Sequence, residues 1–237
     1  MKAMVLAAGL GTRLRPLTND RPKALVEVAG QTLLQITLRR LSSFGIREVI
    51  VNVYHFADLI LDYLKKNSFF GMRIEISQEE ILLDTGGGLK RAAWFFREDS
   101  QPFILHNVDV ISTIDLTRMV QFHAEKEALA TVAVQNRKTS RPLIFDGNGL
   151  FRGRQEGAIP QGMQGLAFSG VHVISPQLLG MICEEGVFSI IDTYIRLASQ
   201  GQRIQAFRAD QYYWRDLGKP ENVVQAQKDA QAGLFEL

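Results

Sequence analysis

The first half of the chain alternates short apolar runs with segments of helical period. β-Branched and apolar runs predict strands at residues 4–6, 48–54, 72–77, 103–105 and 129–134. Leu34, Leu38 and Leu41 recur at helical spacing. The same period predicts helices at residues 57–66, 88–96 and 116–126. Strands separated by such helices indicate βαβ units in an α/β fold with a mostly parallel central sheet. Ligands of such a sheet bind at the carboxyl ends of its strands.

The second half has a different pattern. Residues 143–151 predict a hairpin that turns at Asp146-Gly147, and the glycine-rich residues 153–165 predict a surface loop or a lid. The remaining pattern predicts strands at 166–174, 203–208 and 212–214, a helix at 190–199, and a last helix from Pro220. We see no linker, so we expect a single domain over residues 1–237 with halves 1–135 and 136–237.

Composition excludes several classes of protein. The 237 residues are 46% hydrophobic and 22% charged, which is ordinary for a globular protein. A net charge of +2, without a basic stripe or interleaved aromatic residues, argues against a nucleic-acid-binding protein. No apolar run is long enough to span a membrane, and no signal peptide is recognisable, so we expect a cytoplasmic protein. The single cysteine, Cys183, excludes an internal disulfide.

The loop after the first strand carries the strongest chemical signal. Gly9 and Gly11 follow the strand directly, and glycines there let backbone N–H groups approach a ligand closely. Arg13 lies within the glycine turn, and Lys23 follows the stiffening Pro22. Backbone donors combined with two cations predict a site for a polyphosphate.

Three other interpretations of this loop explain fewer of its residues. A dinucleotide-binding fingerprint needs a third glycine at position 14, where this chain has Leu14. It also needs an acidic residue at the end of the second strand, where this chain has Tyr54. A Walker loop needs a Gly-Lys-Ser/Thr sequence, which this loop lacks. A surface turn with an incidental Arg and Lys would not require the longer pattern of glycine, threonine, proline and basic residues that follows Ala7.

Carboxylates and amides follow other predicted strands. Asp109 ends the fourth strand, and Asp216 is the natural second carboxylate of a Mg²⁺ site; the less favoured alternative is that Asp109 caps its own loop. Gln78 and Glu79 can each offer hydrogen bonds to a nucleobase, or they can be exposed polar residues. Glycines 86–88 stand ahead of a predicted helix, and close approach to a flat ligand would explain them.

The string G-x-G-T-R-x-x-P-x-T-x-x-x-P-K-x-L within Ala7–Gly30 resembles the signature of the sugar-1-phosphate nucleotidyltransferases. The rest of the chain also agrees with this family in the order of its motifs, so the resemblance spans roughly the whole length. The resemblance implies a three-layer αβα, Rossmann-like nucleotidyltransferase fold, with a nucleotide-binding first half and a sugar-binding second half. It also implies an enzyme of sugar-nucleotide biosynthesis that uses Mg²⁺. Such an enzyme transfers a nucleoside monophosphate from a nucleoside triphosphate to a sugar 1-phosphate and releases pyrophosphate.

The resemblance also implies a role for individual residues. Arg13 would stabilise the leaving pyrophosphate, Lys23 would bind the acceptor or the α-phosphate, and Asp109 with Asp216 would hold Mg²⁺. The implied nucleotide-binding residues are Leu6, Ala8, Gly9, Gly11, Thr12, Arg13, Lys23, Gln78, Glu79, Thr85 and Gly86. The implied sugar-binding residues are Asn107, Glu156 and Gly170.

Two positions depart from the family pattern. Val108 replaces the usual glycine before the metal-binding aspartate, and Gly157 replaces a lysine that grips the sugar phosphate. Cations that could substitute for that lysine, or simply form a solvated basic loop, are Arg154, Arg137, Lys138 and Arg141.

Several alternatives remain open from the sequence. Short members of the family suggest UTP with an N-acetylmuramate 1-phosphate-like sugar first, in cell-wall synthesis, and GTP with a mannose or heptose 1-phosphate second. A non-catalytic subunit that senses sugar nucleotides is the alternative of another class, but it would have no need of both metal carboxylates. The chain could be a monomer or a homodimer.

Overall fold

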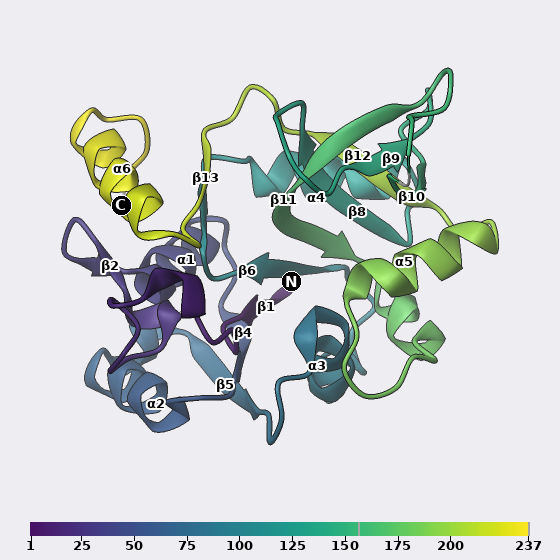
Figure 1. Cartoon of the computed structure of the whole chain (residues 1–237). Helices are drawn as coiled ribbons and strands as arrows, with labels where there is room; N and C mark the ends of the chain where they lie inside the picture. The colour runs from purple at the N-terminus through teal and green to yellow at the C-terminus, as the bar shows by residue number, and fades with distance from the viewer. Residues whose placement is uncertain (156, 237) are drawn as a thin grey trace. The chain divides into compact units, whose positions relative to one another are not determined.

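The computed structural model describes residues 1–155 and 157–236, which form two compact units (Figure 1). Unit 1 comprises Met1–Leu83, His106–Thr113 and Tyr212–Leu237, and unit 2 comprises Asp84–Leu105 and Ile114–Gln211. Each unit is therefore assembled from separate segments of the chain. No helix in the described ranges is long and apolar enough to cross a membrane.

Unit 1 is built on three parallel strands, β1 (Lys2–Leu6), β4 (Glu48–Val53) and β5 (Arg73–Gln78). The register pairs Leu6 with Asn52 and Val53 with Gln78, so the three strands end at the same edge. The apolar residues of β4 and most of those in β1 are buried, as the β-branched runs predict, whereas Ile74 and Ile76 of β5 are partly exposed. The predicted α/β class with a mostly parallel central sheet is confirmed.

Two helices connect these strands. α1 (Leu33–Ser43) begins after Thr32, whose hydroxyl accepts a hydrogen bond from the Gln35 N–H. The leucines that predict this helix are all buried along one face. α2 (Ala57–Lys66) buries Ile60 and Leu64. These two βαβ connections bring the strand ends together as the sequence predicts.

The rest of unit 1 holds a short antiparallel pair, β7 (Val110–Ser112) with β13 (Trp214–Asp216). This pairing joins segments that are about a hundred residues apart in sequence. α6 (Pro220–Gln231) follows β13 directly, and its first turn contains a proline, as predicted. A second small pair, β2 (Glu27–Val28) with β3 (Gln31–Thr32), follows a 3₁₀ turn, Lys23–Leu25.

Unit 2 contains mostly antiparallel strands. Their order is β10 (Phe151–Arg154), β9 (Leu143–Phe145), β11 (Gln164–Ile174), β8 (Ala130–Gln135) and β12 (Ile204–Arg208). Only β8 and β12 are parallel to each other among these pairs. The predicted hairpin is present as β9–β10, where Asp146 accepts hydrogen bonds from the N–H groups of Asn148 and Leu150. The chain passes from unit 2 to unit 1 along β6 (Phe103–Asn107).

The helices of unit 2 are α3 (Asp84–Ala92), α4 (Leu116–Glu125) and α5 (Ile190–Ser199). α5 begins with a capping box at Ser189, the predicted N-cap. The prediction for α3 was wrong at its start, because the helix begins at Asp84 rather than at Gly88 and contains the glycines. The last strand was also placed too early, since β13 begins at Trp214 rather than at Tyr212.

Candidate active site

Gly11 determines the shape of the loop after β1. Its φ of 64° lies in the left-handed region. A Cβ atom there would lie 3.0 Å from the Thr18 side chain and 3.2 Å from Lys23 Cβ. Thr18 holds the turn by donating a hydrogen bond of 2.8 Å to the Gly11 carbonyl. A Cβ at Gly9, in contrast, would meet no atom within 4 Å, so the loop leaves open space at this position.

Lys23 and Asp109 form an ion pair in unit 1. Lys23 is buried in the 3₁₀ turn after Pro22, and its Nζ donates to Asp109 Oδ2. Asp109 lies between β6 and β7, and its carbonyl accepts a hydrogen bond of 2.8 Å from the Leu217 N–H. The two predicted site residues are therefore brought together although they are 86 positions apart.

Asp216 and Arg13 both lie close to Gly218. The Gly218 N–H donates a hydrogen bond of 2.9 Å to Asp216 Oδ1. A Cβ at Gly218 would lie 2.7 Å from that oxygen and 2.9 Å from Arg13 Nη2. Because β13 pairs Asp216 with Val110, the residue after Asp109, two predicted cations and two predicted carboxylates share one site.

The electrostatics of this site fit a divalent cation. Burial raises the pKa of Asp216, and the Asp109 carboxylate raises it further, against the opposing effects of the Gly218 N–H, Lys23 and Arg13. The described residues hold no cluster of three or more metal-binding side chains. Two adjacent carboxylates are nevertheless the protein ligands that Mg²⁺ commonly uses when substrate phosphates complete its coordination.

The two polar residues at the end of β5, Gln78 and Glu79, differ in their exposure to solvent. Gln78 is exposed, whereas Glu79 is buried and has both carboxylate oxygens occupied. Glu79 Oε1 accepts from Asn52 Nδ2 at 2.7 Å, and Oε2 accepts from the Leu83 N–H at 2.9 Å. Of the two predicted base-contacting side chains, Gln78 is therefore the one with an exposed amide.

Thr85 and Gly86 belong to unit 2, where their polar groups are used within the protein. The Gly86 N–H donates to the Phe188 carbonyl at 3.0 Å, and Thr85 Oγ1 accepts from the Ile190 N–H at 3.0 Å. A Cβ at Gly86 would lie 2.4 Å from the Phe188 ring. Close packing of α3 against residues 188–190 thus explains Gly86 without a ligand, and its nucleotide-binding role stays a prediction.

The residues predicted to bind the sugar are described only in part. Asn107 ends β6 with a buried Oδ1 that has no hydrogen-bond partner among the described residues. Gly170 adopts a φ of 78° within β11, at an irregularity in its pairing with β8. Glu156 lies outside the described residues. Arg154 pairs with Asp192 at 2.8 Å, and Arg137 donates to the Phe168 carbonyl.

Three residues that contribute to the site were missed by the sequence reasoning. Thr18 shapes the glycine loop, Asn52 binds Glu79, and Gly218 leaves room for both Arg13 and Asp216. Asn52 gave a usable signal, because it is a polar residue within the apolar run from Val49 to Val53. The roles of Thr18 and Gly218 depend on contacts between distant segments, which no local pattern reveals.

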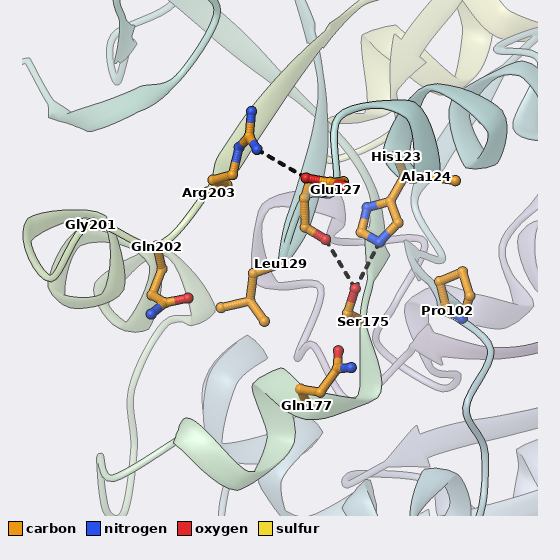
Figure 2. Close-up of a pocket in the computed structure, with 11 residues that line it drawn as sticks. Pro102, His123, Ala124, Glu127, Leu129, Ser175, Gln177, Gly201, Gln202 and Arg203 are labelled. Atoms are coloured by element: carbon orange, nitrogen blue, oxygen red, sulfur yellow. Dashed lines mark hydrogen bonds and ion pairs between the residues drawn. The ribbon is translucent and has the colours of Figure 1, made fainter.

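Unit 2 also contains a pocket of about 530 Å³ that includes none of the predicted residues (Figure 2). His123 lies in its wall, and burial lowers its pKa to about 4. The ring bonds Thr131 Oγ1 and Ser175 Oγ, each at 2.9 Å, and Ser175 also donates to the Ala128 carbonyl. These groups satisfy one another, so we assign no function to this pocket.

Comparison with known proteins identifies the family. A family model described as nucleotidyl transferase matches residues 2–150. The N-acetylmuramate alpha-1-phosphate uridylyltransferase of Caulobacter vibrioides is 35% identical over 99% of this chain and 97% of its own length. A mannose-1-phosphate guanyltransferase of Yarrowia lipolytica is 28% identical over 94% of this chain, which spans only 62% of that protein.

Solved structures agree with this assignment. HddC from Yersinia pseudotuberculosis superposes with a TM-score of 0.79 at 25% identity, over 97% of this chain and 99% of that one. The inositol-1-phosphate CTP transferase from T. maritima shares the fold, with a TM-score of 0.79 at 16% identity over 99% of this chain and 98% of that one. The chain therefore belongs to the nucleotidyl transferase family, as its resemblance to the sugar-1-phosphate members predicted.

Proposed function

We propose that this enzyme transfers a uridylyl group from UTP to a sugar 1-phosphate, with an N-acetylmuramate 1-phosphate-like sugar as the first candidate. The observation that carries the proposal is the convergence of Arg13, Lys23, Asp109 and Asp216 in unit 1. A protein that only senses sugar nucleotides would have no need of two adjacent carboxylates, where the charge of Asp109 helps to raise the pKa of Asp216.

The chemistry follows from these charges. An oxygen of the sugar 1-phosphate attacks the α-phosphorus of the nucleoside triphosphate, a new P–O bond forms, and the bond to pyrophosphate breaks. Arg13 stabilises the charge that develops on pyrophosphate, and Lys23 binds the acceptor or α-phosphate. Mg²⁺ held by Asp109 and Asp216 would neutralise phosphate charge and orient the reacting groups. This reaction requires no protein nucleophile.

Two observations support UTP over GTP. A relative that matches over nearly the full length of both chains is a uridylyltransferase. Within unit 1, Gln78 is exposed and its amide can donate to and accept from the uracil edge, whereas both Glu79 oxygens already accept hydrogen bonds. GTP with a mannose or heptose 1-phosphate is the second candidate, which the guanyltransferases among the relatives favour.

A pyrophosphate-release assay tests this proposal. The purified chain is incubated with Mg²⁺, each of the common nucleoside triphosphates, and a panel of sugar 1-phosphates that includes N-acetylmuramate, glucose, mannose and heptose 1-phosphates. We expect the highest kcat/KM with UTP. A preference for GTP of about tenfold or more would overturn the nucleotide assignment, because a site that hydrogen-bonds one base edge rejects another strongly. Nucleotide binding without pyrophosphate release from any pair would favour the sensor.

A further inference from the structure

A buried polar network links the carboxyl ends of β1, β4 and β5. Asn52 and Glu79 have exposed fractions of only 2% and 3%. Asn52 Oδ1 accepts a hydrogen bond of 2.7 Å from the Ala7 N–H, and Asn52 Nδ2 donates one of 2.7 Å to Glu79 Oε1. Glu79 Oε2 accepts from the Leu83 N–H at 2.9 Å. Two buried polar side chains thus satisfy two backbone groups that leave the sheet.

The position of Asn52 explains why a side chain is needed here. The pairing of β1 with β4 ends at Leu6 and Asn52, so the next amide, that of Ala7, lies beyond the paired residues. The Asn52 side chain takes the place of a backbone acceptor for this amide. Ala7 is the first residue of the loop that carries the glycines and Arg13, so the bond fixes the point at which that loop leaves β1.

The hydrogen-bonding polarity of the network allows only one arrangement. The N–H groups of Ala7 and Leu83 can only donate, and both Glu79 oxygens accept. Asn52 must therefore direct its oxygen to Ala7 and its nitrogen to Glu79. An unpaired buried donor or acceptor in this network would be costly, which favours a single orientation.

We propose that Asn52 is a positioning residue for the nucleotide loop, and that Glu79 acts through Asn52 to hold it in that orientation. This inference rests on the proposed function for its kinetic consequence. Glu79 is also the neighbour of Gln78, so the same pair anchors the chain beside the exposed amide at the end of β5. Glu79 then contributes to nucleotide binding by placing the backbone, and not by contacting the base.

A reversal of polarity tests this role. In Asn52→Asp, two carboxylates face each other. In Glu79→Gln, the nitrogen of the new amide must face either Asn52 Nδ2 or the Leu83 N–H, and both of these are donors. In the double variant, the new carboxylate at position 52 accepts from both the Ala7 N–H and the nitrogen of the new amide at position 79. The oxygen of that amide accepts from the Leu83 N–H. Each single variant leaves at least one mismatched pair, whereas the double variant restores every hydrogen bond of the network, with the direction of the bond between the two side chains reversed.

We expect each single variant to lower kcat/KM for the nucleoside triphosphate by about tenfold or more, mainly through KM, and the double variant to recover to within about threefold of the wild type. Ile50→Val is the matched control, because Ile50 is a fully buried residue of the same strand outside the network. It should lower the melting temperature with little change in KM. A double variant as impaired as the worse single variant, as expected if Glu79 contacts the base, would overturn the proposal.

Hydrogen exchange separates this proposal from the proposed function. In the protein without substrate, the Ala7 amide should exchange faster in each single variant and return to wild-type protection in the double variant. Unchanged protection in both single variants overturns the positioning role even if the wild type is an active transferase. Altered and then restored protection supports it even if no nucleotide and sugar phosphate pair releases pyrophosphate.

Discussion

Gly218 lies against both the Asp216 carboxylate and the Arg13 guanidinium of the candidate active site, so Gly218→Ala should affect activity more than stability. The added methyl group must displace the Asp216 carboxylate or the Arg13 guanidinium, which are ends of flexible side chains. We expect a loss of stability of about 1 kcal/mol or less but a fall in kcat/KM of up to about 10²-fold, because small misplacements of reacting groups are costly. Thermal unfolding and steady-state kinetics measure the two effects.

Gly147→Ala is the matched control for this variant. A Cβ at Gly147, in the β9–β10 turn, would meet no atom within 4 Å, and Gly147 has no positive φ. It should leave both stability and activity near the wild type. Equal kinetic losses in the two alanine variants would contradict the steric explanation.

Arg13→Ala should lower kcat far more than it raises KM for the triphosphate. Charge on the leaving pyrophosphate grows only in the transition state, so its partner contributes mainly there. The loss of one such donor typically costs on the order of 10²-fold or more. Arg21, which is exposed and paired with its neighbour Asp20, provides the control variant Arg21→Ala. An unchanged kcat in Arg13→Ala would show that the guanidinium has another role.

Asp109→Asn and Asp216→Asn should each nearly abolish turnover while the protein stays folded. Each amide keeps the shape of the carboxylate but loses the charge that Mg²⁺ requires. Because burial and the Asp109 charge raise the pKa of Asp216, the ionised Asp216 side chain opposes folding at neutral pH. Asp216→Asn should therefore retain or raise the melting temperature in magnesium-free buffer. Normal turnover of both variants would disprove the metal site.

At the level of elements, β13 depends on α6 for its position. Asp229 of α6 accepts hydrogen bonds from Arg215 Nε and the Tyr213 hydroxyl, both at 2.7 Å, and from Gln225 at 2.9 Å. Burial alone would raise the pKa of Asp229, but these donors outweigh burial, and the pKa is lowered. The helix thus holds the strand that carries Asp216.

Asp229→Ala should destabilise the protein by about 2–4 kcal/mol, since it leaves partly buried donors on Arg215 and Tyr213 without their acceptor. Urea unfolding measures the loss. It should also lower kcat, because Arg215 is the neighbour of Asp216 in β13. Glu221→Ala, on the exposed first turn of the same helix, should change neither quantity. A stability loss as small as that of Glu221→Ala would show that α6 does not hold β13.

Elements that are determined by local interactions were predicted from the sequence, whereas elements that depend on contacts between distant segments were not. α1 and the β9–β10 hairpin carry their own periodicity and turn residues, so the sequence predicted both. The start of α3 was not predictable in this way, because three consecutive glycines disfavour a helix locally. Its first turn is instead stabilised by the Phe188 carbonyl, about a hundred residues away, which accepts from Gly86 and Gly87. Thr18 and Gly218 escaped prediction for the same reason, because their roles depend on contacts that no local pattern reveals.

At the scale of the whole molecule, each unit contains a buried histidine that resists protonation. Burial, reinforced by Arg40, lowers the pKa of His106 in unit 1 to about 4, and burial lowers that of His123 in unit 2 to about 4. The ordinary value for both is 6.5. Between these values the unfolded chain binds protons that the folded protein excludes. Stability is therefore fully present above pH 6.5 and falls as the pH drops toward 4.

We expect this loss to reach about 1.4 kcal/mol per pH unit for each histidine within that window. Asp216 slightly reduces this loss of stability, since its raised pKa lets the folded protein take up a proton that the unfolded chain does not. Urea unfolding at several pH values between about 7 and 5 measures the slope, and His123→Gln should remove roughly half of it. His55→Gln, at an exposed position, is the control and should keep the wild-type slope. If His123→Gln kept the wild-type slope as well, His123 would bind protons as readily in the folded protein as in the unfolded chain, and its hydrogen bonds to Thr131 and Ser175 would need reassignment.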